Sequence, residues 1–305
     1  MIETNVIHKQ DCISGMLSLP KNSIDLCVTS PPYNLNINYS VYKDNKSRQE
    51  YLDWIDQFCV SLNHCLKDNG HFWLNFGYSN IDPWIGMDVA HVVRKHFVLQ
   101  NNFIWVKSIS IDNVTKGHFK PINSERFSNP TWEHLFHFTK TGDIMCDKLS
   151  VGVPYMYDCN IDQSSRIKGR LVKKMGFINQ ADFQKNATEE QIINLEKELS
   201  VKLNNKKERS DKRCKGNSWF IPYDTISDRE KDRGKHPATY PVKLVEDCIL
   251  FSGVKNGILL DPFIGSGTSA IAAIKNNTKY IGYDIDPDYI EFANSRIDDY
   301  KKSVI

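Results

Sequence analysis

The amino-acid sequence predicts a doubly wound, mostly parallel α/β sheet with a basic module inserted into it. Apolar strands alternate with amphipathic helices along most of the 305 residues, which is typical of this fold class. Two of these strands lead directly into loops rich in glycine or proline. The middle of the chain instead changes to a strongly basic composition.

The first half of the chain shows the alternation most clearly. Residues 6–7 and Ile24–Thr29 are predicted strands, and the second is almost continuously apolar, as a parallel strand covered on both faces is. A helix is predicted over residues 47–66, because apolar side chains recur there on one face. Further elements are predicted at residues 71–76 (strand), 83–95 (helix), 98–107 (strand) and 133–138 (strand).

The second half ends in a strand–turn–helix–strand unit. A helix is predicted over residues 242–251, with Pro241 at its first position, where a missing N–H does no harm. It is followed by a predicted strand at 257–260, a glycine turn, a helix at 269–275 and a strand at 280–283.

A basic segment separates these halves. Residues 165–215 hold 14 lysines and arginines against seven acidic residues, a net charge of +7 in a chain whose total is +2. Within it, Thr188 and Gln191 form a capping-box pattern before a helix with one apolar face. Packing inside the module is the favoured role of that face, while a dimer contact or a helix docked on DNA stays open. The chain is therefore divided into residues 1–142, an inserted region 143–218, and residues 219–305.

The composition also excludes several classes of protein. The eight cysteines include no C-x-x-C pair, and the nine histidines show no ligand spacing beside them, so we expect reduced thiols and no metal site. The N-terminal residues are polar, and no apolar run approaches the roughly 18 residues of a membrane span. A cytoplasmic location without membrane contact is expected.

The turn after residue 260 has the features of a ligand-binding site. Gly265 and Gly267 lack a Cβ, so the backbone can turn sharply and approach a ligand closely. The next predicted strand leads to Asp284, 23 residues after Asp261, where an acid can bond ribose hydroxyls.

Two details favour S-adenosylmethionine (SAM) over a dinucleotide at this turn. The sequence Gly-Ser-Gly-Thr lacks the third glycine of the G-x-G-x-x-G pattern, and Asp261 would repel a pyrophosphate. SAM carries a positive ammonium and a sulfonium but no phosphate. Another nucleotide, or a turn that binds no ligand, stays open on these residues alone.

Ser30, Pro31, Pro32 and Tyr33 follow the predicted strand Ile24–Thr29. The prolines stiffen this loop, so the Ser30 hydroxyl and the Pro31 carbonyl are held as acceptors. Acceptors aimed at the N–H groups of a base amine make it a better nucleophile and stabilise its developing charge. Tyr33 adds an aromatic face for a base flipped out of its duplex. Such a turn is common by itself, but its place at the carboxyl edge of the sheet, beside the glycine turn, favours a functional role.

With both motifs in this order, the chain resembles the amino-methylating DNA methyltransferases, which modify cytosine N4 or adenine N6. Residues 29–33 look like the family's catalytic motif and residues 261–268 like its SAM motif, and the catalytic motif comes first, as in the β group. The resemblance covers most of the chain outside about 143–215 and implies a Rossmann-like SAM-dependent methyltransferase sheet. The three regions would then be a catalytic half, a target-recognition insertion and a SAM-binding half.

The resemblance also implies roles for individual residues. The expected catalytic residues are Ser30, Pro31, Pro32 and Tyr33. The expected SAM-binding residues are Asp11, Cys12, Asn75, His236, Pro237, Thr239, Asp261, Phe263, Gly265, Gly267, Thr268 and Asp284. Asp284 departs from the family, in which glutamate is the commoner ribose-binding acid. Expected DNA contacts of the insertion, which could equally form a solvated charged face, are Arg170, Lys173, Lys174, Arg209 and Arg213.

The first motif residue favours cytosine N4 as the target, because family members with serine there are more often cytosine-N4 enzymes. Adenine N6 is the alternative. The implied partners are double-stranded DNA, a cognate restriction endonuclease and a second copy of the chain. A non-catalytic DNA-binding or specificity protein on the same fold, and an RNA or small-molecule methyltransferase, are the competing classes.

Overall fold

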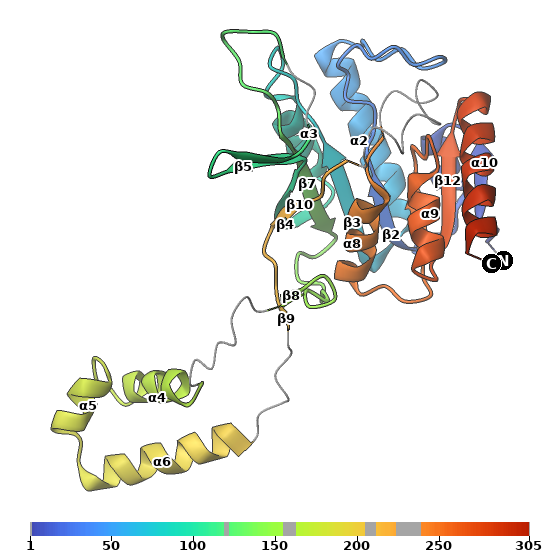
Figure 1. Ribbon diagram of the computed structural model, residues 1–305. Coiled ribbons are helices and arrows are strands. Elements are labelled where there is room, and N and C mark those ends of the chain that lie inside the picture. Colours follow the sequence, from blue (N-terminus) through green and yellow to red (C-terminus); the bar gives the residue numbers. More distant parts are fainter. Residues whose placement is uncertain (1, 119–121, 155–162, 205–211, 224–238, 305) are drawn as a thin grey trace. The chain divides into compact units, whose positions relative to one another are not determined.

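The computed structural model describes residues 2–118, 122–154, 163–204, 212–223 and 239–304 (Figure 1). The chain forms two compact units. The first unit is made of Met1–Val151 and Lys215–Ile305, and the second is Gly152–Cys214. Each unit is described by itself.

A central eight-stranded sheet organises the first unit, in the order β1-β12-β11-β2-β3-β7-β4-β10. The strands are β1 (Val6–Lys9), β2 (Ile24–Thr29), β3 (Leu66–Phe76), β4 (Val98–Val106), β7 (Trp132–Thr139), β10 (Ser218–Phe220), β11 (Ile258–Asp261) and β12 (Lys279–Asp284). The first five in the sheet order run parallel, β7 is antiparallel to both of its neighbours, and β10 is parallel to β4. This arrangement confirms the predicted mostly parallel sheet.

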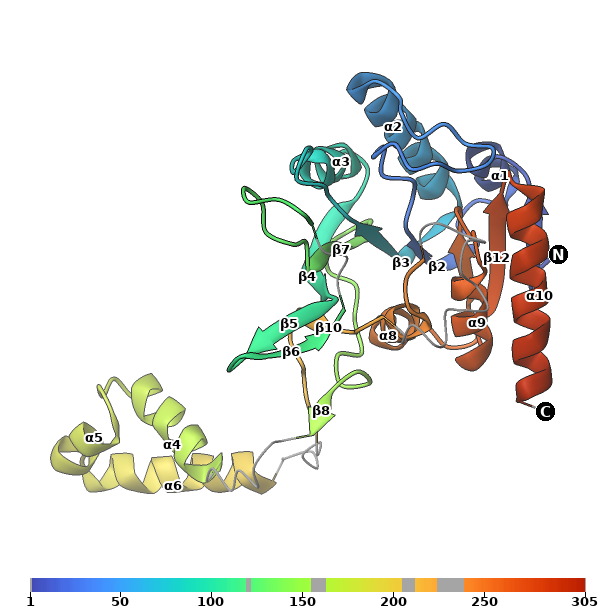
Figure 2. The same cartoon turned by 45° about the horizontal axis from the view of Figure 1, so that its top comes forward.

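Helices cover both faces of this sheet (Figure 2). They are α1 (Cys12–Ser18), α2 (Arg48–Cys65), α3 (Ile85–Val93), α8 (Val242–Ser252), α9 (Thr268–Lys275) and α10 (Pro287–Ser303). Successive strand residues point to opposite faces, so Leu260 packs in one apolar core with α1, α2 and α3, while Leu259 packs in another with α8 and α9. The fold is therefore doubly wound.

The ends of the elements follow from local chemistry. Ser47 caps α2, and its side chain and that of Glu50 form a capping box, so the helix begins at Arg48. The helix ends at Cys65 because Leu66 is already extended and opens β3, five residues before the predicted start of this strand. The expectation for Pro241 was wrong by one position: its extended ψ of 145° makes it the N-cap residue, and α8 begins at Val242.

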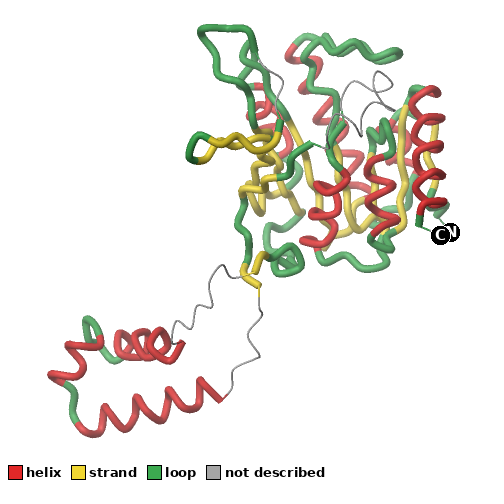
Figure 3. The backbone as a smooth tube through the Cα atoms, in the orientation of Figure 1, coloured by secondary structure: helices red, strands yellow, loops and turns green. Residues whose placement is uncertain are grey.

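The first unit also contains a hairpin of β5 (Ser108–Ile111) and β6 (Val114–Gly117), which stands apart from the main sheet in the tube drawing (Figure 3). The sequence patterns did not predict this hairpin, nor helices α1 and α10. Among the described helices of both units, none is long and apolar enough to cross a membrane.

The described residues of the second unit form three helices and a short β-ladder. They are α4 (Gln163–Lys174), α5 (Gln180–Asn186), α6 (Glu189–Asn204), and the paired β8 (Val153–Pro154) and β9 (Lys212–Arg213). The predicted capping box is present: the Thr188 N–H donates to Gln191 Oε1 (3.0 Å), and the Gln191 N–H donates to Thr188 Oγ1 (3.3 Å). Leu195 is buried in one apolar cluster with Phe183, and Leu199 is partly buried against it, whereas Ile192 on the same face is exposed. Packing inside the unit therefore accounts for part of the apolar face of α6.

Candidate active site

The proline loop and the glycine turn lie at one rim of the sheet. They follow β2 and β11, which are neighbouring parallel strands with Leu260 beside Cys27. The two strand ends are also joined directly, because Thr29 Oγ1 donates a hydrogen bond of 2.7 Å to Asp261 Oδ1. A ligand held by one loop can therefore reach the other.

A cavity of about 400 Å³ opens between the two loops, entirely within the first unit. All four residues of the proline loop line it, together with most of the expected SAM-binding residues. The expected residues in its wall are Asp11, Cys12, Ser30, Pro31, Pro32, Tyr33, Asn75, Thr239, Phe263, Gly265, Thr268 and Asp284. His236 and Pro237 lie outside the described residues, so their role in SAM binding stays a prediction.

Asp261 and Gly267, also expected to bind SAM, lie behind the lining of the cavity. Asp261 is fully buried, and its carboxylate accepts from the Thr29 and Tyr240 hydroxyls, from Ser269 Oγ and from the Phe263 N–H. Burial raises the pKa of Asp261, and the bonds from Ser269 and Thr29 oppose this shift. These contacts give Asp261 a structural role that the sequence did not indicate: it joins the two loops through hydrogen bonds.

One side of the cavity is built from backbone turns and carboxylates. Asp284 Oδ2 accepts from the Gly265 N–H (3.0 Å) and Oδ1 from the Asp286 N–H (2.9 Å), so the carboxylate at the end of β12 is held against the glycine turn. Burial raises the pKa of Asp284, with these backbone bonds acting against it. Asp11 caps α1 through bonds from the Ile13 and Ser14 N–H groups, which fixes its position at the same rim.

The other side contains a chain of hydrogen bonds that begins at Ser30. Ser30 Oγ lies 2.6 Å from Tyr33 Oη, and this phenol donates to Glu133 Oε2 at 3.1 Å. Asn75 Nδ2 donates to both Tyr33 Oη (2.8 Å) and Glu133 Oε2 (2.6 Å). Burial raises the pKa of Tyr33 further above neutrality, so the phenol stays protonated and able to donate. The Tyr51 hydroxyl donates a hydrogen bond of 2.6 Å to the Pro32 carbonyl and thereby holds the proline loop in place.

Glu133 is a lining residue that sequence reasoning missed. Its carboxylate forms an ion pair with Lys107, and both side chains are largely buried. Burial acts to lower the pKa of Lys107, but Glu133 and Tyr223 together outweigh it, and the net pKa is raised. Glu133 lies near the start of β7, and only the antiparallel direction of this strand brings that end to the ligand-binding rim. The sequence pattern indicated a strand there but not its direction.

Asn75 carries an atom that lacks a partner. Its Oδ1 is buried and accepts no hydrogen bond from the described residues, although the side chain lines the cavity. An unpaired buried acceptor is costly, so its presence beside a cavity indicates a ligand with a donor group. The cavity also has an aromatic lining of Tyr33, Tyr39, Tyr42, Trp54, Trp105, Tyr223, Tyr240, Phe263 and Tyr289.

The basic residues expected to contact DNA belong to the second unit. Arg170, Lys173 and Lys174 are exposed on α4, and Arg213 is exposed on β9. Arg209 lies outside the described residues. Arg170, Lys173, Lys174 and Arg213 are not among the described residues that line the cavity.

Comparison with known families shows which family the chain belongs to. A family model described as DNA methylase, which includes N6 and N4 enzymes, matches residues 24–295. The chain belongs to this family. It is thus an amino-methylating DNA methyltransferase. Its central sheet is mostly parallel, as the resemblance implied.

Individual relatives are distant but cover nearly the whole chain. The type II methyltransferase M.ScaI of Streptomyces caespitosus is 24% identical, over 96% of this chain and 81% of that protein. The orphan methyltransferase M.BamHII of Bacillus amyloliquefaciens is 28% identical over 91% and 90%. The DNA adenine methyltransferase YhdJ of Escherichia coli K12 is 23% identical over 97% and 83%.

Solved structures show the same fold. The cytosine-N4-specific PvuII DNA methyltransferase aligns with a TM-score of 0.63 at 17% identity, covering 100% of this chain and 93% of that one. The M1.HpyAVI–SAM complex aligns with a TM-score of 0.51 at 18% identity, covering 95% and 98%.

Proposed function

We propose that this protein transfers a methyl group from SAM to the exocyclic N4 amine of a flipped cytosine in double-stranded DNA, within a restriction-modification system. One observation carries the proposal. Ser30, Tyr33, Asn75 and Glu133 form an acceptor-rich wall in the same cavity as the glycine turn and Asp284. A base amine bound at this wall would therefore lie next to a methyl donor bound at the glycine turn.

The residues on the glycine side fit SAM. The Asp284 carboxylate receives one backbone N–H on each oxygen, which leaves further lone pairs for ribose hydroxyls. Gly265 has a φ of +46° and no Cβ, so the backbone can lie close to the ligand. Asp11, Phe263 and Asp284 line the cavity from three different elements, as an extended nucleoside ligand requires. Bound there, SAM supplies a methyl group on a good leaving group.

The chain's own groups prepare the amine. When Tyr33 donates to Glu133, the Ser30 hydroxyl donates to Tyr33, and the Ser30 Oγ lone pairs stay available for an amine N–H. The Glu133 carboxylate, at the far end of this series of hydrogen bonds, polarises the Ser30 hydroxyl and makes it a better acceptor. As the amine nitrogen becomes positive, its proton passes to Ser30 while Ser30 passes its own proton through Tyr33 towards Glu133. Lys107 holds this carboxylate in place.

The choice of base rests on Ser30. A neutral hydroxyl both donates and accepts, which suits cytosine, where the ring acceptor N3 adjoins the N4 amine. The fold similarity to the cytosine-N4-specific PvuII enzyme supports this choice. Adenine N6 is the second candidate, and the similarity to the adenine methyltransferase YhdJ favours it.

The second unit is proposed to recognise the DNA target. Residues 165–215 carry a net charge of +7, and Lys173 and Lys174 are exposed in the last turn of α4. Lysines and arginines in such a unit bind phosphates and supply affinity that falls with salt.

The nucleoside that the protein modifies tests the proposal. The chain is expressed in a host that lacks DNA amino-methylation, and the DNA is digested and analysed by mass spectrometry. We expect N4-methylcytosine, and none from cells with the Ser30→Ala variant. N6-methyladenine would replace the cytosine proposal with the adenine one, and DNA without either nucleoside would contradict both.

A further inference from the structure

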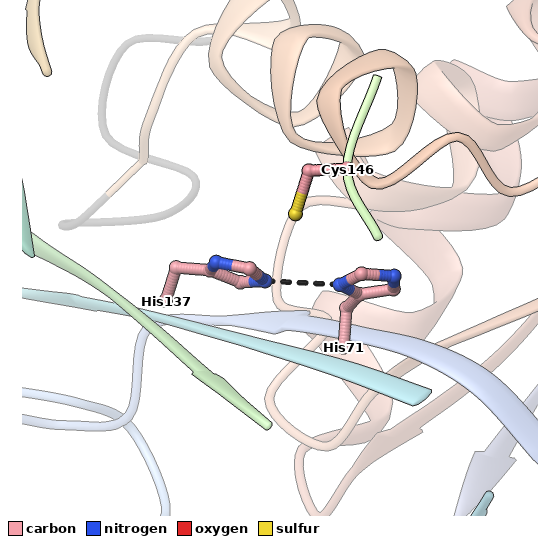
Figure 4. A group of neighbouring side chains, drawn as sticks. All are labelled: His71, His137 and Cys146. Atoms are coloured by element: carbon pink, nitrogen blue, oxygen red, sulfur yellow. Dashed lines mark hydrogen bonds between the residues drawn. The ribbon is translucent and has the colours of Figure 1, made fainter. Parts of the chain in front are cut away.

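A second cluster of reactive side chains lies within the first unit, away from the cavity. His71 near the middle of β3, His137 on β7 and Cys146 on the following loop point towards one another (Figure 4). Their donor atoms all lie within 4.8 Å of one another, and His71 Nδ1 is 2.9 Å from His137 Nε2. Both histidines are buried, and Cys146 is half-buried. None of the three lines the cavity.

We propose that His71, His137 and Cys146 form a structural zinc site. Imidazole nitrogens and a thiolate are the donors that zinc prefers. The three residues lie far apart in the sequence and were therefore not predicted as a set of ligands. The expectation that the chain has no metal site was based only on the spacing of cysteines and histidines in the sequence. Antiparallel pairing of β3 with β7 brings them together.

The geometry requires only small shifts. Zinc bond lengths of about 2.0–2.3 Å in a tetrahedron place the donor atoms roughly 3.4–3.6 Å apart. The two imidazole nitrogens, now 2.9 Å apart, would open by about half an ångström. The sulfur lies within 4.8 Å of both nitrogens, so each N···S distance would shorten by at most about 1.3 Å. The Cys146 thiol would release its proton to solvent, and a water molecule would take the fourth position.

The surroundings suit ligands rather than a simple histidine pair. Both rings are buried, and the 2.9 Å contact between His71 Nδ1 and His137 Nε2 requires that one of these two nitrogens carries a lone pair directed at the other. Asn101 Nδ2 donates to His137 Nδ1 (3.0 Å); flipping this amide would place its oxygen to accept from an Nδ1–H and leave the lone pair of Nε2 for the metal. Gln100 Nε2 donates to the Cys146 sulfur (3.5 Å) and would keep this bond when the sulfur binds a metal.

The site would fasten a loop to the sheet. Cys146 lies in the segment after β7, where the Asp147 N–H donates to the Phe251 carbonyl of α8. This segment leads to Val151, the last residue of the first unit before the chain enters the second. Zinc would thus join β3, β7 and this connecting segment, independently of methyl transfer.

Cobalt, which replaces zinc with the same geometry, tests the site in the full-length protein. We expect one equivalent of Co²⁺ to bind with a thiolate-to-cobalt charge-transfer band and tetrahedral d–d bands. The Cys146→Ser variant should lose the charge-transfer band and bind at least about tenfold more weakly. The matched control is Cys214→Ser, at an exposed cysteine of the second unit, which should behave as the wild type.

Two further readings complete the test. Zinc should raise the melting temperature of the wild type and of Cys214→Ser but not that of Cys146→Ser, whose circular dichroism should match the wild type without metal. Cobalt bound without a thiolate band, or equal binding by wild type and Cys146→Ser, would overturn the proposal. Because these readings do not depend on methylation, they stand or fall separately from the proposed activity.

Discussion

Asp261 shows how a single residue joins the two halves of the site. It is buried at the end of β11, yet four donors satisfy its carboxylate, and one of these is Thr29 at the end of β2. Burying a carboxylate is costly in free energy unless hydrogen bonds within the protein replace those it makes to water. The distance between the proline loop and the glycine turn therefore depends on the Thr29–Asp261 bond.

Replacing Thr29 with valine should weaken the fold measurably. Valine keeps the shape but leaves one acceptor of Asp261 short of a donor, so the free energy of unfolding should fall by about 1–3 kcal/mol. Urea denaturation measures this change. The control Thr115→Val removes an exposed hydroxyl bonded to Ser110 and should change stability by less than about 0.5 kcal/mol. Equal effects at both positions would show that the buried bond contributes nothing particular.

Individual site residues were predictable where a motif fixed the chemistry. Ser30 and Tyr33 belong to one loop, and Gly265 and Asp284 follow two predicted strands, and all four line one cavity. Glu133 and Lys107 were not predictable, because their position depends on the direction of β7 and on the pairing of β7 with β4. The His71–His137–Cys146 cluster was not predictable for the same reason, because strand pairing and not sequence spacing brings its residues together.

At the scale of elements, the start of α9 depends on Gly267. This residue caps the helix with a φ of +78°, and a Cβ there would lie 3.0 Å from the Ala293 Cβ of α10. The close approach of α9 and α10 thus requires a residue without a side chain.

The variant Gly267→Ala should therefore be less stable than a matched glycine variant. Positive φ alone costs an alanine about 1–2 kcal/mol, and the contact with Ala293 adds to this. Gly216 provides the control, because it has a φ of +85° but a Cβ there would meet nothing within 4 Å. Melting temperatures of the two variants make the comparison. If Gly267→Ala lowers the melting temperature no more than Gly216→Ala does, then α9 and α10 can move apart without loss of stability.

Periodicity predicted most elements of the sheet but not all of their limits. The predicted strand at residues 24–29 matches β2, because a buried parallel strand is apolar throughout. The strand β3 extends five residues further towards the N-terminus than predicted, through Asp68–Gly70, residue types that favour turns, with a shift of register against β2. Tertiary pairing here outweighs the local turn preference.

At the scale of the whole molecule, the charges are divided between the two units. The second unit, Gly152–Cys214, holds 13 lysines and arginines against nine acidic residues, a net charge of +4 in a chain that totals +2, so the first unit has a net charge of −2. The proposed catalytic cavity lies in the first unit and the proposed DNA contacts in the second.

Charge reversal at Lys173 and Lys174 should weaken DNA binding and reduce its dependence on salt. Loss of one or two phosphate contacts should lower the slope of log affinity against log salt by about 1–2. Fluorescence anisotropy at several salt concentrations measures this slope. The same reversal at Lys301 and Lys302, exposed in the last turn of α10, is the control. An equal loss in both double variants would mean that only the total charge matters.

The central claim is that one cavity holds a base amine against Ser30 and the methyl donor against Asp284. Single-turnover methyl transfer to DNA by the Ser30→Ala variant, measured over a range of SAM concentrations, tests it most directly. We predict that the maximal rate falls by a factor on the order of 10² while the half-saturating SAM concentration stays at the wild-type value. In the same measurement, Asp284→Ala should instead raise that concentration. An unchanged maximal rate for Ser30→Ala, or a shift only in its SAM requirement, would contradict the claim.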